Sequence, residues 1–203
     1  MTIMIRWEFS WQTGSAHSHV RVCGRHILPN FSTFEHVQAF VIFCMTEIRP
    51  LSANDFSLIL RWENNPELWK VSEQQGPFSE DEISSFINRC LDDSDREIER
   101  WIILSNHESI GAVDIFDFED RNQSCGIGIF ITELQNRSKG HAFRALQMAI
   151  EMLKNRRCRI IRALIYPDNL ASIRLFEKLQ FRFGGSSLFK GRLAHHYSLE
   201  ITT

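Results

Sequence analysis

The stretch TELQNRSKGHAFRAL, residues 132–146, joins a strand-like segment to a helical one and decides the fold. Before it, SCGIGIFIT (124–132) is apolar and bounded by polar residues, which predicts a buried strand. After it, apolar residues spaced three and four apart predict a helix over 138–154, and RIIRALIY (159–166) predicts the next strand. A strand, a helix and a following strand in one sheet normally form a right-handed parallel crossover. The stretch therefore lies where the first strand of a crossover gives way to its helix.

The start of this helix has the composition of an anion site. A helix N-terminus leaves four backbone N–H groups without intrahelical partners and carries about half a positive charge. Gly140, with the small Ser138 and Ala142, would let a ligand approach those groups, while Arg137 and Lys139 add positive charge. This composition predicts a phosphate site, although Gly140 alone could simply ease a tight turn. A P-loop is excluded because Lys139 precedes its glycine, and a dinucleotide fingerprint is excluded because the third glycine is absent.

The rest of the chain from Thr46 onwards alternates between strand and helix signals. Ser52 predicts the N-cap of a helix over 53–64, and Ser79 with Glu82 predicts a capping box for a helix over 80–91. A last helix should begin at Asp168 or Asn169. The other expected strands are TEIRPL (46–51), RWIIL (100–104), IGAVDIFDF (110–118), FRF (181–183) and HHYSLEI (195–201), with NNPELW (64–69) as a loop and Gly184-Gly185 as a turn. This order predicts an α+β domain with a mostly antiparallel central sheet, one β-α-β crossover and flanking helices.

The totals exclude several other classes of protein. The chain has 203 residues and a formal net charge of -2, so no strong field of one sign would draw it to nucleic acid or to a membrane. No apolar run reaches the roughly 20 residues of a membrane span. The five cysteines form no CxxC pair, which suggests neither a disulfide framework nor a zinc site. We expect a cytoplasmic protein with no metal.

Residues 1–44 differ from the rest of the chain in composition and in hydrophobic patterning. They hold four of the eight histidines and few charged residues, and no helical or strand periodicity is sustained over them. We expect a poorly structured N-terminal extension, with translation of the native product starting at Met45 and the folded domain spanning 45–203. A regulatory arm is the alternative.

Three segments together resemble the GNAT family of N-acetyltransferases. Arg137-x-x-Gly140-x-Ala142 is similar to the family's pyrophosphate loop. YPDNLASIRLFEKLQFRF (166–183) is similar to the segment in which an asparagine begins the helix after the crossover strand. IRPLSANDFSLILRWENNPELW (48–69) is similar to the start of the branch that includes ribosomal-protein and polyamine acetyltransferases. The resemblance covers Thr46 to about Ile201.

The resemblance implies acetyl-CoA as co-substrate and assigns residues to it. The backbone N–H groups from Arg137 to Ala142 would hold the pyrophosphate, and the strand edge at Phe130 to Thr132 would bind the pantetheine arm as an added strand. In the family this strand and the crossover strand part at their ends and leave a slot for the thioester, with Asn169 on its far side. The implied cofactor-binding residues are Phe130, Ile131, Thr132, Arg137, Ser138, Lys139, Gly140, His141, Ala142, Asn169 and Phe176.

The implied chemistry is direct attack of a neutral amine on the thioester, with a base for the ammonium and an acid for the thiolate. Many relatives have a tyrosine acid where this chain has Phe176, which cannot donate a proton. Water or another hydroxyl must then act; the only tyrosines are Tyr166, at the end of the crossover strand, and Tyr197, and we take Tyr166 as the candidate. For the base, Asp114 and Glu133 are candidates, although each could be a solvated or substrate-orienting carboxylate.

The acceptor is expected to be an amine of a small molecule or a protein N-terminus. Acidic and aromatic residues near the first two helices could attract it, or could be a helix face with buried tryptophans; they are Trp62, Glu63, Glu67, Trp69 and Glu73. A non-catalytic acyl-CoA-binding sensor is the rival function, and a protein-interaction domain without CoA binding is a third. The sequence leaves the oligomeric state open, a homodimer included.

Overall fold

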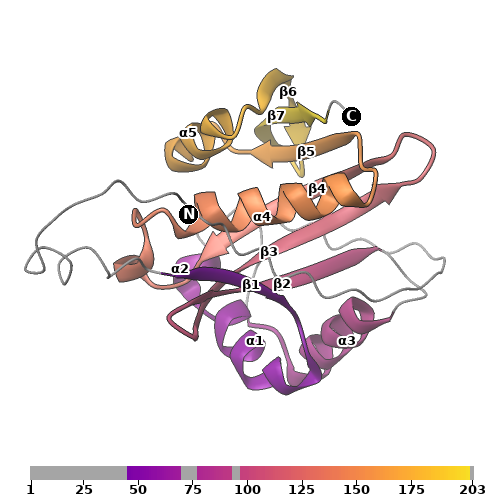
Figure 1. The fold of residues 1–203 in the computed structure, drawn as a ribbon. Helices are drawn as coiled ribbons and strands as arrows, with labels where there is room; N and C mark the ends of the chain where they lie inside the picture. Colours follow the sequence, from indigo (N-terminus) through magenta and orange to yellow (C-terminus); the bar gives the residue numbers. More distant parts are fainter. Residues whose placement is uncertain (1–44, 70–76, 93–96, 202–203) are drawn as a thin grey trace, which may run out of the picture.

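The computed structural model describes residues 45–69, 77–92 and 97–201 (Figure 1). The expectations for residues 1–44, a poorly structured extension or a regulatory arm, lie outside the described residues. Within the described part of the chain, no helix combines the length and the apolar character that crossing a membrane requires.

One seven-stranded sheet forms the centre of the domain, in the order β1-β2-β3-β4-β5-β7-β6. Strands β4 and β5 pair in parallel, and every other neighbouring pair in the sheet is antiparallel. The strands are β1 (Thr46–Pro50), β2 (Ile98–Ser105), β3 (Glu108–Glu119), β4 (Ser124–Ile131), β5 (Ile160–Ile165), β6 (Arg182–Phe189) and β7 (Arg192–Glu200). The predicted fold class is therefore confirmed, with the crossover running from β4 through a helix to β5.

Helices cover both faces of this sheet and enclose two separate cores (Figure 1). They are α1 (Phe56–Glu63), α2 (Pro66–Trp69), α3 (Glu80–Leu91), α4 (His141–Asn155) and α5 (Leu170–Lys178), with short 3-10 helices at Ala53–Asp55 and Leu134–Asn136. The core under α1 and α3 contains Ala112 of β3, whereas the core under α4 and α5 contains its neighbour Val113. This follows from the alternation of side chains along a strand, and a strand buried on both faces reads as continuously apolar.

Three expectations about the elements were wrong in detail. NNPELW is not all loop, because Pro66 starts the short helix α2, where a proline fits the first helical position. Gly184 and Gly185 lie inside β6, at an irregularity in its pairing with β7, and the chain instead turns at Lys190 and Gly191. Helix α4 begins at His141 rather than at 138.

A buried charge cluster ties the helices to the sheet on the α1 face. Arg100 of β2 and Asp114 of β3 are opposite one another in the β2–β3 ladder, and both side chains are fully buried. Arg100 Nε donates to one oxygen of Asp114 at 2.7 Å and Nη2 donates to the other at 3.0 Å. Its Nη1 donates to Glu63 of α1, and its guanidinium lies 4.5 Å from the ring centroid of Phe86 in α3. One cation thus holds α1, α3, β2 and β3 together.

The Asp114→Asn substitution should destabilise the fold by about 3 kcal/mol, because it removes one partner of a buried charge pair and leaves Arg100 under-compensated. Urea unfolding of the full chain measures this change. The matched control is Glu151→Gln, which removes a carboxylate that is 53% exposed in an ion pair with Lys154. That control should cost less than about 1 kcal/mol. Equal losses in the two variants would contradict the structural role of Asp114.

Candidate functional site

Strands β4 and β5 separate after a short stretch of pairing. Their parallel ladder contains three residue pairs, from Ser124 with Ile160 to Gly126 with Arg162. Further along, β4 continues to pair with β3 as far as Ile131, and β5 continues to pair with β7 as far as Ile165. One edge of β4 is therefore open beyond Gly126, and a slot lies between the two strands.

The open edge presents backbone groups of Ile131. The Thr132 N–H donates to the Ile110 carbonyl of β3 at 2.9 Å, so Thr132 faces β3. Because successive residues of a strand point their backbone groups to opposite edges, Ile131 faces the slot. Arg137 lies at this end of the strand, where its Nε donates to the Ile131 carbonyl at 3.2 Å and its Nη2 donates to the Thr132 carbonyl at 3.3 Å. Phe130, Ile131 and Thr132 were expected to bind the pantetheine arm. Of these three residues, Ile131 is the one whose backbone N–H points to the open edge of β4, because backbone groups alternate between the two edges of a strand.

The loop from β4 to α4 turns sharply before the helix begins. Ser138 has φ 60° and Gly140 has φ 83°, both in the left-handed region, so the chain cannot extend the helix back to 138. Gly140 is the N-cap of α4, and a glycine has no side chain to accept hydrogen bonds from the first turn. The N–H groups of residues 141–143 therefore have no acceptor within the helix or from its cap.

A polar clamp fixes this loop to the first strand. Thr46 Oγ1 lies 2.9 Å from His141 Nδ1 and accepts a hydrogen bond from Arg144 Nε at 3.0 Å. Arg144 Nη2 also donates to the Lys139 carbonyl at 2.9 Å. Burial of His141, together with the charges of Arg144 and Lys139, lowers the pKa of the imidazole. His141 is thus neutral at pH 7, and the turn is held by β1 rather than left loose.

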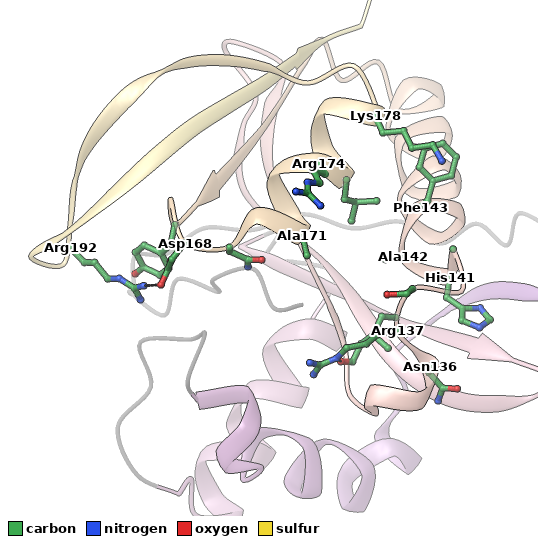
Figure 2. Close-up of a pocket in the computed structure, with 16 residues that line it drawn as sticks. Asn136, Arg137, His141, Ala142, Phe143, Asp168, Ala171, Arg174, Lys178 and Arg192 are labelled. Atoms are coloured by element: carbon green, nitrogen blue, oxygen red, sulfur yellow. Dashed lines mark hydrogen bonds and ion pairs between the residues drawn. The ribbon is translucent and has the colours of Figure 1, made fainter.

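A cavity of about 570 Å³ lies between this turn, the slot and α5 (Figure 2). Among the described residues, the basic ones that line it are Arg137, Arg174, Lys178 and Arg192, and the one acidic residue is Asp168. Two of these residues form an ion pair, with Arg192 Nη2 donating to Asp168 at 2.6 Å. The cavity is therefore net positive and meets free helix amides, which suits a ligand with several negative charges.

Tyr166 lies at the Arg192 end of the cavity. Its side chain is 6% exposed and follows the last residue of β5. The Arg192 guanidinium carbon lies 3.9 Å from the centroid of the Tyr166 ring, a cation–π contact. Tyr197, the other tyrosine of the chain, is not in the cavity lining and donates to Glu177 at 3.4 Å. Tyr166 is thus the phenol that the cavity offers.

Eight of the predicted site residues line the cavity: Ile131, Arg137, Ser138, Gly140, His141, Ala142, Tyr166 and Asn169. Asn169 also caps α5, because its Oδ1 accepts from the Ser172 N–H at 3.2 Å. Lys139 is exposed and outside the lining, while Thr132 is buried against β3.

The remaining predicted residues lie elsewhere. Phe130 is in the α1–α3 core, with its ring centroid 5.6 Å from that of Trp62. Phe176 is 0% exposed and packs against Phe181 in the other core. Asp114 is held by Arg100 away from the cavity, and Glu133 is exposed just after β4. None of these four side chains lines the cavity within the described residues.

The acidic and aromatic residues that were suggested to attract the acceptor amine also have other roles in the structure. Trp62 is buried, and Glu63 pairs with Arg100 in the core. Trp69 Nε1 donates to the Glu63 carbonyl at 2.6 Å, and Glu67 is exposed. Glu73 lies outside the described residues. Most of this cluster is therefore structural.

Sequence reasoning missed four charged residues of the cavity. Arg174 and Lys178 line it together with Ala171 and Leu175, which places all four on one face of α5. Their spacing was a usable signal, because residues three and four apart share a helix face. Asp168 lies in the turn before α5 and Arg192 is the first residue of β7, and no spacing pattern links two residues so far apart in sequence.

Comparison with known proteins shows the family of the chain. A family model described as an acetyltransferase (GNAT) domain matches residues 46–182, which is more than half of the chain. An uncharacterised protein of Methanocaldococcus jannaschii is 28% identical over 141 residues, covering 66% of this chain and 28% of that protein. The chain thus spans little more than a quarter of that relative.

Solved structures share the fold. A domain from Methanocaldococcus jannaschii has a TM-score of 0.66 at 25% identity, covering 78% of this chain and 99% of that one. A spermidine N-acetyltransferase from Vibrio cholerae, in complex with CoA and spermine, has a TM-score of 0.68 at 19% identity and covers 76% of this chain and 95% of that one. The aminoglycoside acetyltransferase AAC(6')-Ib, in complex with coenzyme A, has a TM-score of 0.65 at 17% identity, with coverages of 77% and 95%. The family match confirms the resemblance found in the sequence.

Proposed function

The chain belongs to the GNAT acetyltransferase family, and we propose that it transfers an acetyl group from acetyl-CoA to a primary amine. The observation that carries the proposal is one cavity that contains both the open edge of β4 at Ile131 and the uncapped start of α4. The first is suited to an extended amide chain and the second to a diphosphate. The proposed acceptor is a small cationic amine or a protein N-terminus.

The residues of the cavity fit acetyl-CoA, which supplies an activated thioester carbonyl when bound. The N–H groups of residues 141–143 would hold its diphosphate. The Ile131 N–H, which strand alternation directs to the slot, would bind the pantetheine arm or polarise a carbonyl. Asn169 lies across the slot at the start of α5.

Tyr166 is the proposed proton donor of the site. Phe176 has no hydroxyl and is buried in the core, so it cannot serve. Tyr166 lines the cavity at the end of β5, and Tyr197 does not. For the acceptor ammonium, we prefer Glu133 acting through water, because it is exposed and its neighbours Ile131 and Asn136 line the cavity. Asp114 is a poor base here, since Arg100 occupies both of its oxygens.

The acceptor class is supported by two relatives of the same fold. One is a spermidine acetyltransferase and the other an aminoglycoside acetyltransferase, and both names describe polyamine-like acceptors. A cationic amine is also compatible with Asp168, the acidic residue of the cavity lining. Because the cavity is otherwise basic, the acceptor would approach at the Asp168 and Tyr166 end.

The Gly140→Asp substitution should weaken acetyl-CoA binding by at least about tenfold, because it adds a negative charge at the turn that faces the diphosphate. Isothermal titration with acetyl-CoA measures the affinity. Gly140→Asn is the matched control, since asparagine has the same shape as aspartate and both tolerate the left-handed conformation of this position. Equal affinities of the two variants would place the diphosphate elsewhere.

A thiol-release assay with spermidine, an aminoglycoside and a peptide with a free N-terminus tests the activity itself. We expect wild-type turnover with at least one of these amines. Tyr166→Phe should lower kcat by about a hundredfold and leave the affinity for acetyl-CoA unchanged, because general acid catalysis contributes about that much. Tight acetyl-CoA binding by the wild type without turnover would instead favour the acyl-CoA-binding sensor.

A further inference from the structure

Two cations on α5 are not matched by any acidic group of the described chain. Arg174 and Lys178 are one helical turn apart and both line the cavity. None of the ion pairs or hydrogen bonds within residues 45–69, 77–92 and 97–201 involves Arg174 or Lys178. The other two cavity arginines differ, because Arg137 donates to strand carbonyls and Arg192 pairs with Asp168.

Lys178 nevertheless has a defined position. Its Nζ lies 4.6 Å from the ring centroid of Phe143, in the first turn of α4. Figure 2 shows Lys178 and Phe143 at one end of the cavity, Asp168 and Arg192 at the other, and Arg174 between them. Lys178 therefore lies at the opposite end of the cavity from Arg192, which is in contact with Tyr166.

We propose that Arg174 and Lys178 form a second anion subsite that binds the 3'-phosphate of coenzyme A. This inference rests on the proposed function and adds a specificity for the phosphorylated cofactor. Coenzyme A carries a diphosphate and a separate phosphomonoester on its ribose. The helix amides at 141–143 suit the diphosphate, which leaves the two α5 cations for the third phosphate.

The chemistry of the two side chains suits a phosphomonoester. A guanidinium can donate two parallel hydrogen bonds to phosphate oxygens, and an ammonium acts as a compact point charge. A phosphomonoester also carries more negative charge than either phosphate of a diphosphate diester, so it is attracted more strongly by two adjacent cations. Dephospho-coenzyme A lacks this group and should lose these contacts alone.

Isothermal titration of the full chain with coenzyme A and with dephospho-coenzyme A tests the subsite. The wild type should bind coenzyme A about tenfold or more tightly than dephospho-coenzyme A. Arg174→Gln and Lys178→Gln should each reduce this ratio while keeping the affinity for dephospho-coenzyme A within about twofold. Lys154→Gln is the control, because it removes the same charge at the opposite end of α4.

The outcomes separate the subsite from the proposed function. Equal wild-type affinity for the two ligands, or equal weakening of both by the α5 variants, would overturn the subsite and leave acetyl transfer intact. If Lys154→Gln also lost the preference for coenzyme A over dephospho-coenzyme A, the effect would be one of general charge, and the subsite would be overturned. Absence of binding by either ligand would overturn both.

A different pair of residues carries a second inference. Cys125 of β4 and Cys158, just before β5, have their sulfur atoms 3.6 Å apart. Cys125 is 1% exposed and Cys158 is half-buried. The pair lies where β4 and β5 are still joined, since Cys125 is paired with Ile161. Both thiols therefore lie at the closed end of the slot.

The two sulfurs differ in acidity. The hydrogen bond from Cys125 lowers the pKa of Cys158 to about 7, and the same contact together with burial raises the pKa of Cys125. Cys158 is therefore the more acidic thiol of the pair, and the thiolate is the form that attacks a disulfide. Cys90, by contrast, is partly buried against the other core, and the burial of its thiol raises its pKa to about 12.

We infer that Cys125 and Cys158 form a reversible disulfide that staples the closed end of the slot when glutathione disulfide is the oxidant. The Cys158 thiolate attacks glutathione disulfide, forms a mixed disulfide and releases one glutathione thiolate. Cys125 then loses its proton to that thiolate and attacks the Cys158 sulfur, which expels a second glutathione. The two cysteines are oxidised and one glutathione disulfide is reduced to two glutathiones.

Peptide mapping of the full chain after incubation with glutathione disulfide tests the staple. We expect a linked pair of peptides containing Cys125 and Cys158, and a rise in Tm because the bond closes a loop between residues 33 apart. The rise should disappear in Cys158→Ser and persist in Cys90→Ser. Glutathione adducts on Cys158 without the linked pair, or linkage without a change in Tm, would overturn the inference.

Discussion

The separation of β4 from β5 is the constraint on which the rest of the site depends. Three parallel residue pairs join the strands, and beyond Gly126 each strand pairs only with its other neighbour in the sheet. The backbone of Ile131 then faces a slot rather than a strand. The unpaired N–H and C=O groups of a strand edge need hydrogen-bond partners. Arg137 supplies one for the carbonyl, and the N–H remains for a ligand. The sheet is thus left incomplete at the slot, which is the physical reason for proposing a binding site there.

The rest of the fold holds this gap open. Arg100, Asp114 and Glu63 hold β2, β3 and α1 together on one face, so β4 is attached to a rigid half of the sheet. The β5–β7–β6 half is covered by α5, with Tyr197 of β7 donating to Glu177 of that helix. The clamp between Thr46 and His141 then fixes the start of α4 between the two halves. The core under α4 and α5 includes Ile129 of β4 and Ile165 of β5, so packing on that face holds the two strands in place where they no longer pair.

The sequence predicted the order of strands and helices well because each element has a strong local signal. The period of apolar residues, the capping box at Ser79 and the cap at Asn169 all act within a few residues. The site was predicted less completely. Asp114 looked like a candidate base, but its surroundings depend on Arg100, which is 14 residues away and meets it across the β2–β3 ladder. Periodicity shows that a residue is buried, and it does not show which charged residue another strand brings opposite to it.

The roles of the aromatic residues also depend on surroundings that the sequence does not show. Phe176 occupies a position where the family often has a tyrosine, and here its side chain is enclosed against Phe181. A hydroxyl in such a place would need a hydrogen-bond partner or would cost free energy on burial, so phenylalanine suits the core. Tyr166 has the opposite placement, with a ring that lines the cavity beneath Arg192. The tyrosine that many relatives carry on α5 is missing here. A phenol at the end of β5, which lines the cavity, could donate the proton in its place. The absence of a tyrosine at 176 is therefore no argument against catalysis.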